Sequence, residues 1–187
     1  MSKHLQRLLI ILIVAILGAL TSTGAIQNKP VSKSSLAGIS STQWYPIKKV
    51  VDGDTIDVQI GTSTTRVRLI GLDTPEVVDP RKPVQCFGKA ASDEAKRMLT
   101  GQSVRLETDP TQSTHDKYGR LLAYIYVPAD SQPNGILFNE YMISEGYGHE
   151  YTYDVPYEHQ QEFKSAQKAA QNGQKGLWAP GVCMPTS

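Results

Sequence analysis

The sequence lacks a large excess of charge of either sign. It has 187 residues, with 19 Lys and Arg against 18 Asp and Glu, which leaves a formal net charge of +1 at neutral pH. A chain with this balance has no strong overall field to attract a polyanion such as nucleic acid. Any site for a polyanion must therefore be built locally. The length is that of one domain with one core.

The sequence also lacks an apolar run as long as a membrane helix requires. Its most apolar stretch, residues 8–20, is shorter than the roughly 20 residues of a bilayer span. Lys3 and Arg7 precede it and small residues follow it, which is the layout of a secretory signal peptide. Residues 21–26 are uncharged and could lengthen the run, so residues 1–25 are either a cleaved signal peptide or an uncleaved membrane anchor. In both cases we expect an exported chain, secreted or held at the outer face of the cytoplasmic membrane.

Cysteine is scarce, since Cys86 and Cys183 are the only two. An oxidising compartment favours a disulfide between them, which would tie the tail 181–187 to the domain, and two unrelated thiols are the alternative. The four histidines are scattered and show none of the close ligand pairs of a structural zinc site. We therefore do not expect zinc.

Hydropathy and turn residues divide the rest of the chain. Residues 26–42 are polar and rich in Ser, without a hydrophobic period, which predicts a flexible stem before a domain at 43–180. Within that domain, β-rich segments separated by turn residues predict five strands, at 45–51, 55–60, 66–72, 103–107 and 121–127. Helical spacing predicts helices at 87–99, 138–145 and 157–171. Residues 128–135 are interpreted as a turn-rich connection. This order predicts an α+β, mainly β fold, with an OB-like five-stranded barrel and three helices.

Charged residues gather in three segments at the ends of predicted strands, namely 52–55, 68–76 and 116–120. Asp54 opens one strand, while Asp73, Thr74 and Glu76 lie where another ends. Carboxylates and carbonyls grouped in this way are hard oxygen ligands that suit calcium better than zinc or copper. Each segment also has a purely structural interpretation, because Asp-Gly is a common hairpin turn and the 73–76 segment is compatible with a turn or helix cap.

Two arginines adjoin these carboxylates in the pattern. Strand alternation places Arg68 on the same face as Ile70 and Leu72, partly inside a barrel wall, where a charge needs a partner. Arg120 follows a Tyr-Gly turn and precedes an apolar strand. Two guanidiniums beside a metal cluster can hold a phosphate and offset the charge of a five-coordinate transition state. Two ordinary surface arginines are the alternative.

Three motifs, in this order, resemble those of the staphylococcal nuclease (thermonuclease) family: VVDGDTIDV, VRLIGLDTPE and DKYGRLLAYIY. The resemblance extends from about Tyr45 to Trp178, and it is specific because all three motifs keep their order and approximate spacing. It implies a secreted or membrane-anchored member of bacterial type. It also implies a calcium-dependent nuclease of DNA and RNA that breaks the 5′ P–O bond and leaves 3′-phosphate products.

The resemblance also implies roles for individual residues. Asp54, Asp73 and the main-chain carbonyl of Thr74 would bind Ca²⁺. Glu76 would act as general base or orient the attacking water. Arg68 would clamp the phosphate, and Arg120 would act from the leaving-group side.

Nucleotide contacts are implied for Lys117, Tyr118, Tyr151 and Tyr153. Stacking on tyrosine tolerates any base, so broad activity on single-stranded or locally melted nucleic acid is expected. An exposed loop with ordinary tyrosines is the alternative. The extra Asp79 between Val77 and Pro83, both cysteines and the near-neutral charge depart from the family's best-known member.

Two other functions compete with the enzyme. One is a catalytically weak or inactive OB-fold module that binds nucleic acid at the cell envelope. Such a module would lack Arg68, Glu76 or Arg120, and all three are present. The other is an envelope-anchored interaction domain with a purely structural calcium site, which would need costly ion pairs in a barrel wall. We expect a monomer.

Overall fold

The computed structural model describes residues 39–77 and 83–183. The predicted signal peptide or anchor, most of the predicted stem and the last residues of the tail lie outside the described residues. The same holds for Asp79, Arg81 and Lys82. In the part of the chain that is described, no helix is both long and apolar enough to span a bilayer.

The first three strands form an antiparallel meander. They are β1 (Trp44–Asp52), β2 (Thr55–Ile60) and β3 (Ser63–Leu69). The β2–β3 register pairs Ile60 with Ser63 and Thr55 with Arg68, so the two strands stay in step over the whole of β2. Val58, Val67 and Leu69 are buried, so the apolar positions of β2 and β3 face the same interior.

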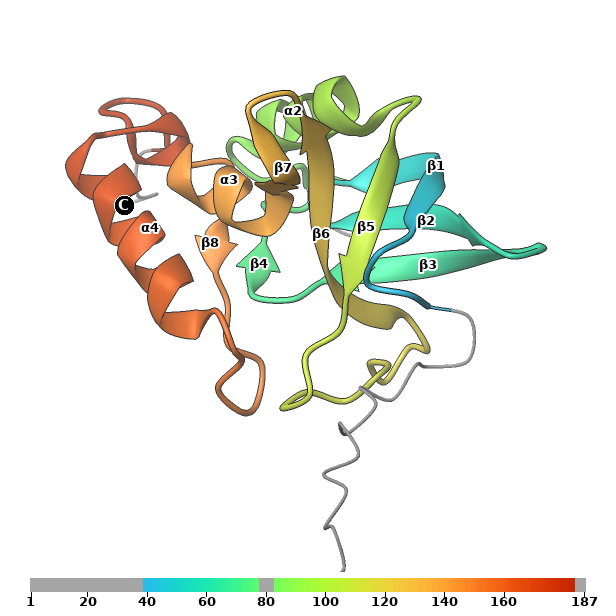
Figure 1. The fold of residues 1–187 in the computed structure, drawn as a ribbon. Coiled ribbons are helices and arrows are strands. Elements are labelled where there is room, and N and C mark those ends of the chain that lie inside the picture. Colours follow the sequence, from blue (N-terminus) through green and yellow to red (C-terminus); the bar gives the residue numbers. More distant parts are fainter. Residues whose placement is uncertain (1–38, 78–82, 184–187) are drawn as a thin grey trace, which may run out of the picture. The chain divides into compact units, whose positions relative to one another are not determined.

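The sheet closes into a barrel, as the sequence predicts. Its strand order is β3-β2-β1-β5-β6-β7, with an additional pairing between β3 and β6. Strands β5 (Ser103–Glu107) and β6 (Leu121–Ala129) complete the ring. The closing pair is parallel and aligns Val67 with Leu121 and Arg68 with Leu122. Figure 1 shows α2 (Gly88–Leu99) across the end of the barrel near β1 and the other helices on the β6 side, with the last long helix farthest from the barrel.

The interpretation of residues 128–135 as a turn-rich connection is wrong. Strand β6 continues to Ala129 and turns into β7 (Gln132–Leu137), which pairs Val127 with Ile136. Pro133 is tolerated because β7 is an edge strand. Gly135 has φ +79°, and a Cβ there would lie 2.5 Å from the carbonyl oxygen of Val127. Pro and Gly hid this strand because they interrupt the alternation on which strand prediction depends.

The predicted third strand, 66–72, is broken in the structure. Strand β3 ends at Leu69, Gly71 takes φ +74°, and the chain resumes as the short β4 (Leu72–Asp73). A Cβ on Gly71 would lie 2.7 Å from the rings of Tyr157 and Phe163, so only glycine fits this turn. Strand β4 pairs with β8 (His149–Glu150) and places Asp73 opposite His149.

The remaining helices cover the barrel on the side of β6. They are α3 (Phe138–Ser144), α4 (Gln160–Asn172) and the 3-10 helix η1 (Gly176–Trp178). Helix α4 begins at Gln160 rather than at the predicted Tyr157. Tyr157 precedes it in a turn and packs its ring in the core, 5.6 Å from the ring of Phe163.

Candidate active site

Asp54 and Thr74 meet although they are 20 residues apart in the chain. Asp54 immediately precedes β2 and is only 7% exposed. Its Oδ2 accepts hydrogen bonds from the backbone amide of Thr74 at 3.0 Å and from the Thr74 hydroxyl at 3.1 Å. Its Oδ1 accepts one from the Thr55 hydroxyl at 2.8 Å. Gly53 allows this approach, because a Cβ there would lie 2.8 Å from the Thr74 side chain.

Arg68 brings the two predicted metal carboxylates together. Its Nη2 lies 3.3 Å from Oδ2 of Asp54 and 3.0 Å from Oδ1 of Asp73. The β2–β3 register explains this position, since Arg68 stands opposite Thr55, the neighbour of Asp54. Nη1 donates to the carbonyls of Leu69 at 2.9 Å and Leu72 at 2.5 Å. The guanidinium is therefore fixed on two sides.

The face predicted for Arg68 is wrong, although its need for partners is met. Val67 and Leu69, its neighbours in β3, are the residues that point into the core, so Arg68 lies on the opposite side of the strand. The predicted face assumed that one strand continued to Leu72. The break at Gly71 changes the alternation, and Ile70 and Leu72 are buried after it.

The carboxyl groups around Arg68 influence one another. Burial raises the pKa of Asp73, the charges of Asp54 and Glu76 add to the rise, and Arg68 opposes it. Burial also raises the pKa of Asp52 to about 6, with smaller contributions from Asp54 and Glu76. Asp52 accepts a hydrogen bond of 2.8 Å from the Gly53 amide, which agrees with its interpretation as a turn residue. This accumulation of negative charge favours a bound cation.

The atoms around Arg68 that could bind a metal ion are oxygen atoms. The described residues contain no group of three or more His, Cys, Asp and Glu side chains already arranged to hold a metal ion. Two carboxylates, those of Asp54 and Asp73, do converge on one guanidinium nitrogen. Oxygen ligands of this kind fit a hard divalent cation such as Ca²⁺, and Thr74 lies directly against Asp54.

Glu76 is held through its backbone by Gln85, a residue that the sequence prediction missed. The Glu76 amide donates to Oε1 of Gln85 at 2.7 Å, and the Gln85 amide donates to the Glu76 carbonyl at 2.9 Å. No motif contains Gln85, so nothing in the sequence pattern signals it.

Arg120 does not contact Asp54 or Asp73 through any described hydrogen bond or ion pair. Its Nε lies 2.6 Å from Oδ2 of Asp116, and its amide donates to Oδ1 of the same residue. It immediately precedes β6, whose Leu122 is the parallel partner of Arg68. Barrel closure thus places Arg120 at the start of the strand that pairs with the strand of Arg68.

The predicted nucleotide-binding residues form an exposed cation–aromatic cluster. Nζ of Lys117 lies 5.2 Å from the ring centre of Tyr118 and 5.8 Å from that of Tyr153. The rings of Tyr151 and Tyr153 are 6.3 Å apart, and Tyr118 and Tyr153 are 72% and 70% exposed. The Tyr151 amide donates to the Gly71 carbonyl, which links this cluster to the turn before Asp73.

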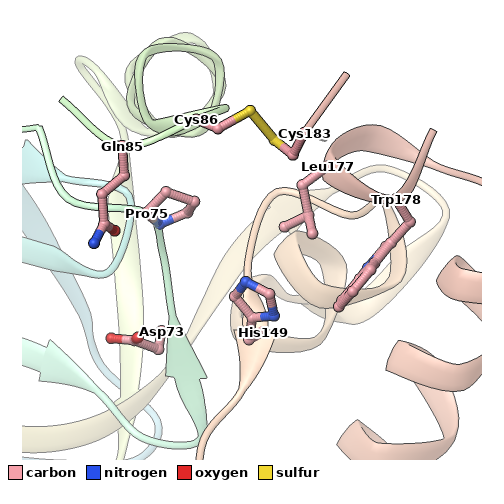
Figure 2. A pocket seen from close by; sticks show the side chains of 8 residues that line it. All are labelled: Asp73, Pro75, Gln85, Cys86, His149, Leu177, Trp178 and Cys183. Atoms are coloured by element: carbon pink, nitrogen blue, oxygen red, sulfur yellow. A yellow bond between two sulfur atoms is a disulfide. The ribbon is translucent and has the colours of Figure 1, made fainter. Parts of the chain in front are cut away.

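A pocket of about 430 Å³ adjoins Asp73. Figure 2 shows Asp73 and His149 at one end and the Cys86–Cys183 disulfide at the other, with Gln85 and Trp178 on opposite walls. Burial lowers the pKa of His149, whose ring meets that of Trp178 edge-on at 5.0 Å. His149 is a second residue near the site that the sequence motifs did not indicate.

Comparisons with known proteins agree with this geometry. The profile of the family described as "Staphylococcal nuclease homologue" matches residues 66–180. A thermonuclease of Staphylococcus hyicus is 38% identical over 170 residues, covering 91% of this chain and 95% of the relative. A thermonuclease of Staphylococcus intermedius is 42% identical over 134 residues, covering 72% and 75%. The endonuclease YncB of Bacillus subtilis (strain 168) is 31% identical over 134 residues, covering 71% of this chain and 60% of the relative.

The barrel, the convergence of Arg68 with two carboxylates and these similarities lead to one conclusion. The chain is a nuclease, a hydrolase of phosphodiester bonds, and belongs to the staphylococcal nuclease family.

Proposed function

We propose that this nuclease depends on calcium, cleaves both DNA and RNA, and breaks the 5′ P–O bond to leave 3′-phosphate products. The observation that carries the proposal is the position of Arg68, whose Nη2 lies within 3.3 Å of Asp54 and 3.0 Å of Asp73. A cation-seeking carboxylate pair and a phosphate-binding guanidinium therefore share one site.

Asp54, Asp73 and the carbonyl of Thr74 are the groups that would hold the ion. A bound divalent cation supplies Lewis-acid polarisation of a phosphoryl oxygen and a lower pKa for coordinated water. Asp54 suits this purpose because it is buried and held by Thr55 and Thr74, so its position does not depend on the ion alone.

Arg68 would bind the phosphate and stabilise the negative charge that develops on it. Its Nη1 is anchored by the carbonyls of Leu69 and Leu72, which fixes the direction of the guanidinium before substrate arrives. Fixed donors need no reorganisation at the moment of reaction, which is why they stabilise a transition state more than mobile ones.

Glu76 would accept the proton of the attacking water or orient it, since it follows Asp73 and Thr74 and its charge acts on Asp73. Arg120 would neutralise charge on the departing 5′ oxygen. The ion pair with Asp116 and the parallel alignment of β6 with β3 hold Arg120 beside the strand of Arg68.

Substrate contacts would come from Lys117, Tyr118, Tyr151 and Tyr153. Three of these side chains, those of Lys117, Tyr118 and Tyr153, lie together through cation–ring contacts. Exposed rings stack on any base and a lysine attracts any phosphate, so this cluster supports binding of single-stranded DNA and RNA without sequence preference.

Export is part of the proposal and rests on the sequence alone. The charged and apolar pattern of residues 1–25 supports a secreted or membrane-anchored nuclease outside the cell. We propose that it acts there as a monomer.

The test measures cleavage of single-stranded DNA and of RNA by the purified protein with Ca²⁺ or with a chelator. The proposal predicts chelator-sensitive cleavage, 3′-phosphate ends by mass spectrometry, and a rate lower by at least about a hundredfold in Glu76→Gln. Glu158→Gln is the matched control, because Glu158 is exposed on the surface before α4. Binding without cleavage would instead support the inactive binding module.

A further inference from the structure

Glu76 and Gln85 are joined by a reciprocal pair of hydrogen bonds. The Glu76 amide donates to the Gln85 side-chain oxygen at 2.7 Å, and the Gln85 amide donates back to the Glu76 carbonyl at 2.9 Å. Glu76 lies beyond β4, so no strand neighbour fixes its backbone. The pair fixes the Glu76 backbone at both its amide and its carbonyl, and so contributes to the direction in which the carboxylate leaves the chain.

The segment that carries Gln85 is itself held at three adjacent positions. Cys86 is bonded to Cys183, 97 residues away in the sequence. The ring of Phe87 stacks on Tyr147 at 5.7 Å, with Phe87 in the left-handed region at φ +65°. A Cβ on Gly88 would lie 2.6 Å from Val77 and 2.9 Å from the Pro75 carbonyl, so the start of α2 rests on the Glu76 segment.

We propose that Gln85 is a positioning residue for Glu76 and that the Cys86–Cys183 bridge holds Gln85 in the position that this requires. The inference rests on the proposed role of Glu76. In this role Gln85 acts through Glu76. Its side-chain oxygen holds the Glu76 backbone amide. The bridge at Cys86, the next residue along the chain, in turn holds Gln85, and Figure 2 shows Gln85 and this bridge.

Gln85→Met removes the acceptor but keeps the length of the side chain, and Gln85→Glu retains an acceptor at the same distance from the backbone. We expect Gln85→Met to lower kcat about tenfold, the effect of one ordinary hydrogen bond, with KM changed less than about twofold. Gln85→Glu should restore most of the rate. Gln161→Met, on the exposed face of α4, is the control and should match the wild type.

Making Gln85→Met in the Glu76→Gln variant tests whether Gln85 acts through Glu76. If Gln85 acts through Glu76, Gln85→Met should lower the residual rate less than about twofold in that background, because the two residues act as a unit. An equal loss in both backgrounds would overturn the inference, as would a Gln85→Glu variant as slow as Gln85→Met.

The bridge is tested with Cys86→Ser combined with Cys183→Ser, assayed at a temperature where circular dichroism shows every variant folded. We expect a several-fold lower kcat, and no further loss when Gln85→Met is added, since both changes release the same contact. Losses that simply multiply would show that the bridge does not act through Gln85.

Hydrogen exchange of the Glu76 amide gives a readout independent of activity. Its exchange should be about tenfold faster in Gln85→Met and close to wild type in Gln85→Glu. Unchanged exchange in Gln85→Met overturns the inference whatever the activity is. If the wild type cleaves and loses its rate in Glu76→Gln, yet keeps its kcat in Gln85→Met, that result overturns the inference and leaves the proposed function standing. If Glu76→Gln cleaves as fast as the wild type, the proposed role of Glu76 is overturned, and this inference with it.

Discussion

The side-chain amide of Asn139 donates a hydrogen bond of 2.8 Å to the carbonyl of Ile70. The same side chain accepts one of 3.0 Å from the Ile125 amide, and Asn139 is completely buried. One residue of α3 therefore ties β6 to the turn that carries the chain from β3 to Asp73.

Replacing Asn139 with Leu should destabilise the fold by about 2 to 4 kcal/mol, because two buried backbone groups lose their partners. Urea unfolding followed by circular dichroism measures this free energy. Asn134→Leu, on the exposed part of β7, is the control and should change it by less than about 0.5 kcal/mol. A similar small change in Asn139→Leu would show that the buried contacts contribute little.

The turn at Gly71 should tolerate no side chain. Gly71→Ala combines the strain of φ +74° with contacts of 2.7 Å to Tyr157 and Phe163, so we expect a loss of more than about 2 kcal/mol. Gly61→Ala separates the two effects, because φ there is +59° and nothing lies within 4 Å of the added Cβ. It should cost about 1 kcal/mol, from backbone strain alone. Equal losses in the two variants would exclude a packing contribution at Gly71.

Asp109 should stabilise the protein at neutral pH and lose this effect in acid. Burial alone would raise the pKa of Asp109, but hydrogen bonds from the Glu158 amide, the Tyr124 hydroxyl and Thr111 outweigh burial and lower it. A lowered pKa means that the contribution is complete above the unfolded-state pKa of about 3.9 and disappears as the pH falls through the lower folded-state value.

Asp109→Asn tests this pH dependence. Asp109 accepts hydrogen bonds through both Oδ1 and Oδ2, whereas an Asn side chain has only one acceptor oxygen. It should lower the free energy of unfolding by about 1 to 3 kcal/mol at pH 7, and the difference from wild type should shrink below about pH 4. Thermal unfolding of both proteins between pH 7 and pH 3 measures it. A difference that stays constant over this range would contradict the linkage.

Arg68→Lys should lower kcat/KM by about a hundredfold or more, since lysine cannot hold two carbonyls and face two carboxylates at once. Arg66→Lys, in the same strand but half exposed and paired with Asp57, is the matched control and should cleave normally. Initial rates on single-stranded DNA give both values. Near-normal cleavage by Arg68→Lys would remove Arg68 from the catalytic machinery.

The sequence was sufficient to predict the barrel, because Val58, Val67 and Leu106 follow the alternation of strands that bury one face. It was also sufficient to predict that Asp54, Arg68 and Asp73 lie close together, since the motifs that contain them are specific. The break at Gly71 was not predictable from local pattern. The apolar residues on both sides continue the strand signal, and the rings that demand glycine come from residues 157 and 163.

Gln85, His149 and the β6–β7 hairpin could not be predicted for a related reason. Gln85 acts through a hydrogen bond to a residue nine positions earlier, and His149 reaches Asp73 through a strand pair formed late in the chain. Such contacts depend on tertiary packing, which leaves no periodic or compositional trace in the residues themselves.

The parallel contact between β3 and β6 also has a kinetic consequence. Arg120 immediately precedes β6, a strand that is synthesised long after Arg68, and only closure of the barrel pairs that strand with β3. Non-local pairing of this kind forms slowly because distant segments must find each other first. A refolding chain would therefore regain the circular dichroism signal of β-sheet before it regains catalysis. The rate at which activity returns would report the closure of the barrel between β3 and β6.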